Sequence, residues 1–168
     1  MEPIPKPMHS FTSGTPDDEH SLIPWSRVVE QLQRARNYWV CTVGPDGAPH
    51  ATPVWCSFVG GTLYFGGDDR TRRGRHLADN RAVAVHLEST TDVVIVEGTV
   101  EEVTPDPQLA LLLAQEAAVK YGMESGPEQW MSRTMYAVHP RVVFAWNGEF
   151  RANATRHVFP DQPPSPAQ

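Results

Sequence analysis

The chain has 168 residues, enough for one domain with a buried core, and its formal net charge is −6. This acidic balance argues against a general nucleic-acid binder, because phosphate contacts need a basic face. No apolar run approaches the roughly 18 residues that span a bilayer, and the N-terminus lacks the apolar stretch of a signal peptide, so we expect a soluble cytoplasmic protein without membrane contacts.

Prolines concentrate at the two ends of the chain. Of the 16 prolines, five lie in residues 1–24 and four in residues 160–168. Neither segment shows apolar periodicity, so we interpret 1–24 and 160–168 as flexible tails that are mobile or lie on a partner. Residues 25–159 are expected to form the folded domain.

The first half of the domain predicts one helix and a β-meander. A short amphipathic helix is expected over Arg27–Arg36, with Pro24 and Ser26 at its start. Three strands joined by glycine-containing turns follow, over Tyr38–Val43, Pro49–Val59 and Thr62–Gly66. Pro53 interrupts the second strand. Because proline cannot donate to a ladder, it marks an edge, a bulge or a place where the strand opens toward something else.

The second half predicts one long helix between further strands. Asp106–Tyr121 has a capping Asp106, Pro107 at its first position and Gly122 after its end. The other expected elements are two helical turns over Gly74–Asn80, strands over Arg81–Glu88 and Asp92–Val103 with a bulge at Gly98, a helical turn within Ser125–Arg133, one or two strands over Tyr136–Val138 and Val142–Trp146, split at His139-Pro140, and a last strand over Ala154–Phe159. Closely spaced strands joined by hairpins indicate a mainly β (α+β) antiparallel barrel, because closure removes exposed edges.

Cysteines and histidines give no metal pattern. Cys41 and Cys56 are the only cysteines, and each lies in an apolar, strand-like run, so we expect two small buried residues. No cluster of histidines and carboxylates has metal-ligand spacing, and no Ser/His/Asp or Cys/His arrangement is recognisable. The sequence therefore predicts no metal site and no triad.

A basic segment, Arg70–Leu77, is the strongest functional signal. Four of its first six residues are arginines, although the chain as a whole is acidic. Like charges repel unless an anion lies among them, and arginine forks match phosphate and carboxylate oxygens. Gly74 would let the backbone approach such a ligand at the start of a helix. The alternative is a solvated basic loop, in which Arg70 pairs with Asp68 or Asp69.

Motifs in a fixed order give the chain a family resemblance. They are Tyr38–Val43, Pro45–His50, Thr52–Trp55, Leu63–Phe65, Thr71–Leu77, Asn80, Val96–Thr99 and Ala154–Arg156. With them the chain resembles the pyridoxamine 5′-phosphate oxidase-like (PNPOx-like) superfamily, whose fold is the antiparallel, FMN-binding type of split β-barrel. It resembles most the actinobacterial branch of flavin or deazaflavin (F420)-dependent oxidoreductases. The resemblance implies a homodimer with cofactor sites at the subunit interface, each lined by both chains.

The resemblance also implies which residues would bind the cofactor. The ring would face the second strand, at His50, Ala51, Thr52, Pro53 and Val54, and would lie beside Phe65 and Gly66. Arg73 stands where the family commonly has a phosphate-binding Lys or Arg, with Thr71, Arg72 and Arg75 as neighbours. His76 stands where many relatives carry Asn, and Trp146 lies in a strand that relatives bring across the dimer interface.

The catalytic group is left open. His50 is a candidate proton donor, although a single histidine is more often structural. The Arg-x-His pair that grips pyridoxal phosphate in true pyridoxamine phosphate oxidases has no counterpart, because Arg156 and His157 are adjacent. Oxidation of vitamin B6 is therefore not expected.

Four functions remain to be weighed. The first is an F420-dependent oxidoreductase that transfers hydride to an unsaturated small-molecule acceptor, because several arginines suit a polyanionic tail. The second is an FMN-binding oxidoreductase of the same fold, or a carrier that binds flavin or F420 without catalysis. A nucleic-acid-binding barrel is disfavoured by the net charge.

Overall fold

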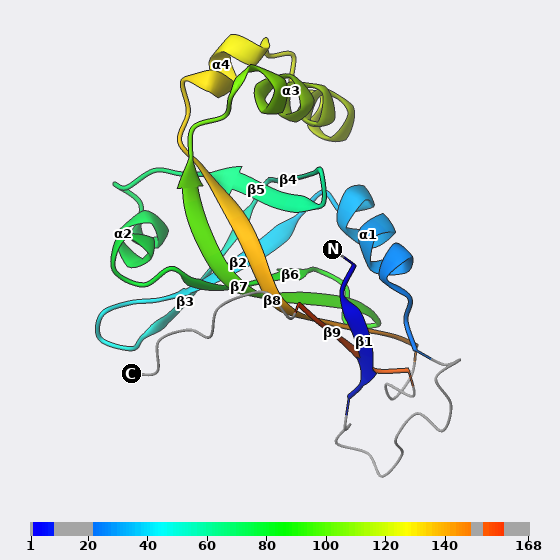
Figure 1. Ribbon diagram of the computed structural model, residues 1–168. Helices are drawn as coiled ribbons and strands as arrows, with labels where there is room; N and C mark the ends of the chain where they lie inside the picture. Colours follow the sequence, from blue (N-terminus) through cyan, green and yellow to red (C-terminus); the bar gives the residue numbers. More distant parts are fainter. Residues whose placement is uncertain (1, 9–21, 149–152, 160–168) are drawn as a thin grey trace.

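One antiparallel sheet, whose strands are not in chain order, forms the body of the protein (Figure 1). The computed structural model describes residues 2–8, 22–148 and 153–159. The strands are β1 (Ile4–Pro7), β2 (Tyr38–Val43), β3 (Pro49–Val54), β4 (Cys56–Val59), β5 (Thr62–Gly66), β6 (Ala82–Leu87), β7 (Asp92–Val103), β8 (Met135–Asn147) and β9 (Thr155–Val158). The helices are α1 (Trp25–Arg34), α2 (Arg72–Asp79), α3 (Pro107–Tyr121) and α4 (Pro127–Met131).

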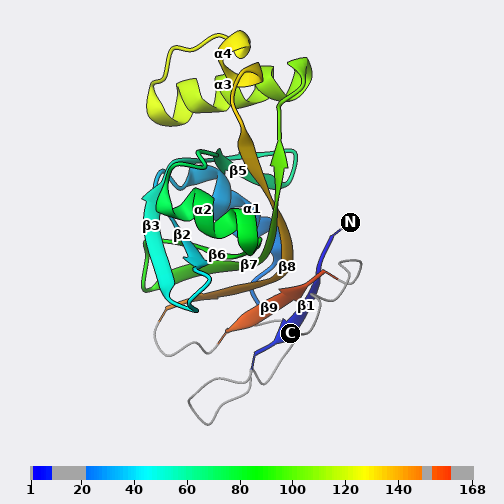
Figure 2. The same cartoon turned by 90° about the vertical axis from the view of Figure 1, so that its left-hand side faces the viewer.

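The sheet curls into an open barrel around one main core. Its strand order is β1-β9-β8-β7-β6-β2-β3, with β5 pairing β8 and β4 pairing β5. The barrel core draws its buried side chains from α1, α2 and most strands, while α3 and α4 bury a second, smaller cluster with Met135. In Figures 1 and 2, α3 and α4 lie beyond the ends of β7 and β8, and α2 lies beside the β2–β3 hairpin. The expected mainly β split barrel with one long helix is confirmed.

Local sequence signals located two features correctly. Helix α3 begins after Asp106, whose side chain accepts a hydrogen bond from the Leu109 amide, and it ends at Gly122 with φ 69°. Strand β7 shifts register between Glu97 and Gly98. A Cβ atom at Gly98 would lie 2.0 Å from the His139 carbonyl oxygen, so only glycine fits this bulge.

Two predicted strands have different limits. The segment Pro49–Val59 is two strands rather than one, because the chain leaves the first sheet ladder at Trp55, which stacks on Tyr121 with ring centroids 4.9 Å apart. The predicted split at His139-Pro140 is wrong. Pro140 lies inside the continuous β8, opposite the Gly98 bulge, where the irregular ladder tolerates a missing donor.

The start of helix α1 and the N-terminal segment also differ from expectation. Ser26 does not cap α1, whose N-cap residue is Pro24 without a side-chain hydrogen bond. Residues 4–7 form β1, which pairs with β9 and was not predicted. The proposed division into tails and domain stays a prediction otherwise, because residues 9–21 and 160–168 lie outside the described residues.

The cysteines are both free thiols in the described chain. Cys56 is buried and Cys41 is half-buried, so the expectation of two buried residues is correct for Cys56 only. None of the described helices is long and apolar enough to cross a membrane. Within the same residues, no three His, Cys, Asp or Glu side chains gather as metal ligands would.

Candidate functional site

The start of helix α2 is held against the loop that precedes it. Thr71 caps the helix, since its Oγ1 accepts a hydrogen bond from the Gly74 amide at 2.9 Å and donates one to the Asp68 carbonyl at 2.7 Å. A Cβ atom at Gly74 would lie 2.0 Å from that same carbonyl oxygen. Gly74 therefore lets the helix pack on its own loop, and the expectation that it opens the backbone to a ligand is corrected.

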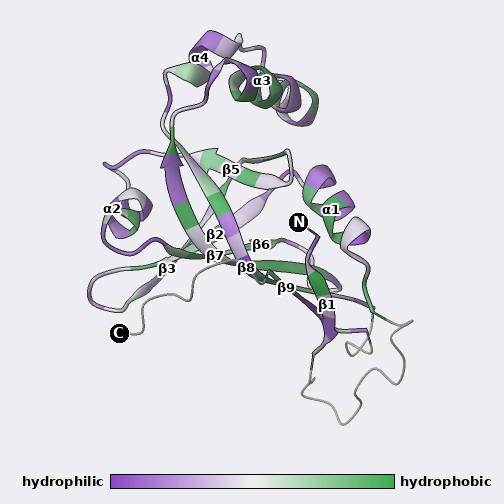
Figure 3. Cartoon of the chain, viewed as in Figure 1, coloured by the Kyte–Doolittle hydropathy of each residue, from purple (hydrophilic) through white to green (hydrophobic). Residues whose placement is uncertain are grey.

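The four arginines of this segment have different surroundings. Arg70 pairs with Asp68, with its Nε 3.1 Å from the carboxylate, and its side chain is 87% exposed. Arg75 donates from Nη1 to the Arg70 carbonyl oxygen at 2.7 Å, and Arg72 is exposed. The largely hydrophilic α2 is visible in Figure 3. The alternative of a surface ion pair thus holds for Arg70, and Arg75 supports the loop.

Arg73 is the arginine that turns inward. Its guanidinium carbon lies 5.5 Å from the centroid of the buried Phe65 ring, and its Nη2 donates to the Gly66 carbonyl oxygen at 3.2 Å. Burial lowers its pKa, and its Nε is buried without a hydrogen-bond partner among the described residues. A buried, unsatisfied N–H on a cation is costly, so this side chain fits an anionic oxygen.

Two histidines lie beside this position. His76 is buried, with its Nδ1 3.1 Å from Thr42 Oγ1, and its ring meets that of His50 edge to face at 5.7 Å. Thr42 is also the partner of His50 in the β2–β3 ladder. Desolvation lowers the pKa of His50, and the charges of Arg72 and Arg73 lower it further. The buried His76 ring therefore packs against the His50 ring and does not face solvent.

Strand β3 presents its residues alternately. His50, Thr52 and Val54 are half-buried, while Ala51 and Pro53 are exposed. Among the described strands, β3 pairs only with β2, so Pro53 marks an edge of the described sheet, which is one of its predicted alternatives. Phe65 and Gly66, at the end of β5, lie beneath Arg73. The structure thus gathers β3, the end of β5 and the start of α2 on one side of the barrel (Figure 2).

Trp146 lies elsewhere in the same chain. It pairs with Val93 near the end of β8, whereas Met135, at the start of β8, pairs with Gly66. Within one chain Trp146 is therefore separated from Arg73 by nearly the whole length of β8. It could join the site only from another copy, which is what the resemblance implies.

Tyr136 is a neighbour of the site that sequence reasoning did not single out. Its ring lies 5.3 Å from Phe65, and it lines a groove of about 650 Å³ together with Gly66, Arg133 and Glu102. Desolvation raises the pKa of its hydroxyl. No local signal identifies Tyr136, because its place depends on the pairing of β5 with the distant β8.

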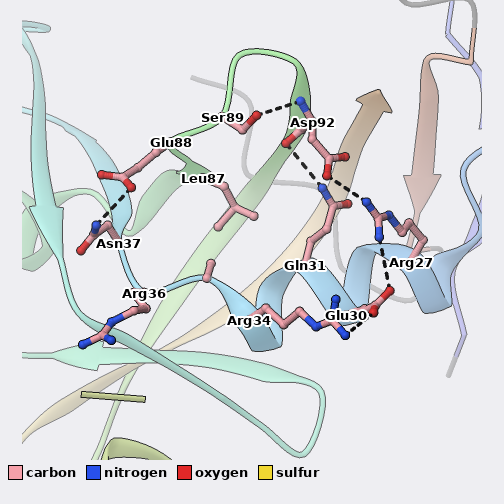
Figure 4. A pocket seen from close by; sticks show the side chains of 11 residues that line it. Arg27, Glu30, Gln31, Arg34, Arg36, Asn37, Leu87, Glu88, Ser89 and Asp92 are labelled. Atoms are coloured by element: carbon pink, nitrogen blue, oxygen red, sulfur yellow. Dashed lines mark hydrogen bonds and ion pairs between the residues drawn. The ribbon is translucent and has the colours of Figure 1, made fainter. Parts of the chain in front are cut away.

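A second groove, of about 360 Å³, lies between the end of α1 and the β6–β7 hairpin (Figure 4). Its charged groups mostly neutralise one another. Arg27 contacts both Asp92 at 2.9 Å and Glu30 at 3.4 Å, and Arg34 contacts Glu30 at 2.9 Å. Such internal pairing leaves little net field for a charged ligand, in contrast to Arg73, whose Nε has no hydrogen-bond partner among the described residues.

Comparison with solved structures identifies the fold. The conserved hypothetical protein Rv2991 from Mycobacterium tuberculosis is 20% identical, with a TM-score of 0.65 over 75% of this chain and 86% of that one. A structure described as an F420 reductase is 24% identical, with a TM-score of 0.54 over 68% and 93%. An FMN-binding protein related to pyridoxamine 5′-phosphate oxidase, from Nostoc punctiforme, is 17% identical, with a TM-score of 0.58 over 85% and 95%.

The sequence itself also matches a family. No curated protein matches the chain. The family profile described as pyridoxamine 5′-phosphate oxidase matches residues 25–149, which include β2 to β8 and therefore Arg73, His50 and the whole of α2. The chain belongs to the pyridoxamine 5′-phosphate oxidase family, in the flavin-binding split-barrel fold.

Proposed function

We propose that this protein is an oxidoreductase that uses F420 and transfers a hydride to an unsaturated small-molecule acceptor. The observation that carries the proposal is Arg73, a half-buried cation beside the Phe65 ring, whose Nε has no hydrogen-bond partner in the described part of the chain. The likeness to an F420 reductase supports this choice at the level of the fold. The cofactor, when bound, would supply the two-electron chemistry.

The residues of this chain would bind and orient that cofactor. Arg73 would hold a phosphate oxygen, and the exposed Arg72 would lie toward the rest of an anionic tail. Thr71 and Gly74 fix the helix that carries both arginines. F420 is preferred over FMN because its tail carries several negative charges, whereas FMN ends in one phosphate.

His50 is the chain's candidate for proton transfer. Its pKa is lowered, so it is neutral near pH 7, and it can then accept a proton or share one with a ligand. The His76 ring packs against the His50 ring, and Thr42 Oγ1 in turn lies 3.1 Å from His76 Nδ1. His157, by contrast, is completely buried, so it cannot contact a substrate with its neighbour Arg156, and oxidation of vitamin B6 finds no support.

A homodimer is part of the proposal. The groups on β3, β5 and α2 form one wall of a site, and a second copy would have to supply another, with Trp146 as the candidate residue. The size of the protein in solution, with and without cofactor, tests this point.

FMN dependence and a carrier function are the alternatives. The likeness to an FMN-binding protein favours the first of these at the level of the fold. Turnover separates enzyme from carrier: the protein loaded with reduced F420, or with reduced FMN, is mixed with a panel of enones and quinones, and cofactor absorbance is followed. We expect oxidation of F420 by some acceptors. Binding without oxidation by any acceptor would favour the carrier.

A further inference from the structure

Helix α3 is largely apolar on both of its faces. One face packs into the second, smaller core cluster, through Ala110, Leu113, Ala114 and Ala117. The opposite face, called here the outer face of α3, is exposed and consists of Gln108, Leu111, Leu112, Gln115, Ala118 and Val119. Leu111 is 46% exposed, Leu112 41% and Val119 90%. Because a helix that is apolar all round is normally buried, we expect a partner to cover this outer face.

The outer face of α3 carries no charge. Charged residues make up 20% of the chain, but α3 contains only two of them, Glu116 and Lys120. These two side chains pair with each other at 2.8 Å, and 19% and 5% of their surfaces are exposed. Nucleic acids and anionic lipids are bound through basic side chains, which the outer face lacks.

A second copy of this chain suits such a face electrostatically. Each copy has a formal net charge of −6, so two copies repel where their charged surfaces approach. Like charges that face each other in an interface cost free energy, and an uncharged face avoids that cost. The exposed glutamines, Gln108 and Gln115, add to the match, because an amide side chain has both donors and an acceptor and can pair with its own copy.

The positions of the outer face are also symmetric about Gln115. Leu112 and Ala118 lie three residues before and after it. Leu111 and Val119 lie four residues before and after it. A two-fold axis through Gln115 would set two antiparallel helices so that each position faces its mirror position. Each leucine of one copy would then face the smaller alanine or valine of the other, which lets the two rows of side chains interdigitate.

We propose that the outer face of α3 binds the same face of a second copy of this chain, with the two helices antiparallel and crossing at Gln115. The inference goes beyond the proposed function and does not depend on a cofactor. The contact is separate from the one proposed for Trp146, because α3 lies beyond the Met135 end of β8 (Figure 1) and Trp146 near the opposite end of that strand. Together the two contacts would join four copies.

The expected contact is small. One pair of 15-residue helices buries less surface than the roughly 1,600 Å² of a standard protein–protein interface. We therefore expect a dissociation constant in the micromolar range, so that the contact forms and breaks with protein concentration.

Charges introduced at Gln115 test the two-fold contact. Gln115→Glu and Gln115→Lys each place two like charges opposite each other across the axis, whereas an equimolar mixture of the two variants places opposite charges there. Gln33→Glu and Gln33→Lys are the matched controls, because Gln33 is also an exposed glutamine on a helix, α1. The three residue types have similar helix propensities, so the fold should be kept, and thermal unfolding checks it. Analytical ultracentrifugation over a concentration series gives the mass.

At high concentration we expect wild type and both Gln33 variants to have twice the mass of either Gln115 variant, and their dissociation constants to be about tenfold lower. The equimolar mixture of Gln115 variants should return to the wild-type mass. Equal masses of wild type and the Gln115 variants at every concentration would overturn the proposal, and so would a mixture that stays at the lower mass. Cofactor affinity should not change in either Gln115 variant, so a failure of the proposed function would appear separately, as wild-type protein that binds neither F420 nor FMN.

Discussion

Gly74→Ala should lower both the stability of the fold and the affinity for the cofactor, because Gly74 packs helix α2 on its own loop next to Arg73. The added Cβ would lie 2.0 Å from the Asp68 carbonyl oxygen and 2.8 Å from the Asp69 Cα, and both atoms are main chain. Ordinary contacts of this kind are well over 3 Å, so helix α2 or the loop must move by more than 1 Å. Overpacking of this kind costs about 1–3 kcal/mol, partly offset by the better helix propensity of alanine, about 1 kcal/mol.

The assay combines urea unfolding with cofactor titration. We expect a lower free energy of unfolding and weaker cofactor binding, since Arg73 is the residue before Gly74 and moves with it. Gly66→Ala is the matched control for stability, because a Cβ at Gly66 meets no atom within 4 Å. That variant should stay within about 0.5 kcal/mol of wild type. Unchanged stability and binding in Gly74→Ala would refute the role of this close contact in placing Arg73.

Three further predictions concern the rest of the framework. Thr71→Ala removes the α2 cap and should cost about 1 kcal/mol in urea unfolding, and Thr71→Ser should restore most of it. Glu116→Ala removes the carboxylate 2.8 Å from the buried Lys120 ammonium and leaves it only neutral partners, Tyr38 and Cys56, so it should cost about 3–5 kcal/mol, whereas a cost below about 1 kcal/mol would show that the pair is dispensable. His157 has a pKa lowered by burial, so the unfolded chain binds a proton more readily: stability should fall as the pH drops below about 6.5 until the folded-state pKa is reached. His157→Phe should flatten that slope relative to wild type, and an identical slope would exclude His157 as its cause.

Features specified by neighbouring residues were predictable from the sequence. The caps of α3 are an example, since Asp106, Pro107 and Gly122 act within one turn of the helix. The Gly98 bulge was also predictable, because an isolated glycine in a strand has few other roles. The order of motifs was enough to indicate the split barrel.

Features that depend on distant contacts were not predictable. The break between β3 and β4 involves the stacking of Trp55 on Tyr121, which the sequence does not place together. From the sequence Pro140 predicts a strand break, but in the structure it lies opposite the bulge of β7, inside β8. Strand β1, although rich in proline, pairs with the side of β9 that faces away from β8, a contact between segments about 150 residues apart in the sequence.

The candidate site shows the same division. The segment 70–77 was identified from its charge, and the family resemblance put Arg73 first among its four arginines. The tertiary structure adds the physical contrast: Arg70 pairs with Asp68 two residues away, whereas Arg73 reaches Gly66 and Phe65 across the turn. The position of Tyr136 likewise depends on the pairing of β5 with β8, and the contact of His76 with His50 depends on the packing of α2 on β2.

Cofactor binding by Arg73→Ala is the most direct test of the central claim. Wild type, Arg73→Ala and Arg70→Ala are titrated with F420 and FMN, and Arg70→Ala serves as the control because its side chain is exposed and paired with Asp68. Loss of a charge-assisted hydrogen bond of about 1.5–3 kcal/mol predicts binding roughly 10- to 150-fold weaker for Arg73→Ala, and near-normal binding for Arg70→Ala. Equal affinity of Arg73→Ala and wild type for both cofactors would contradict the account.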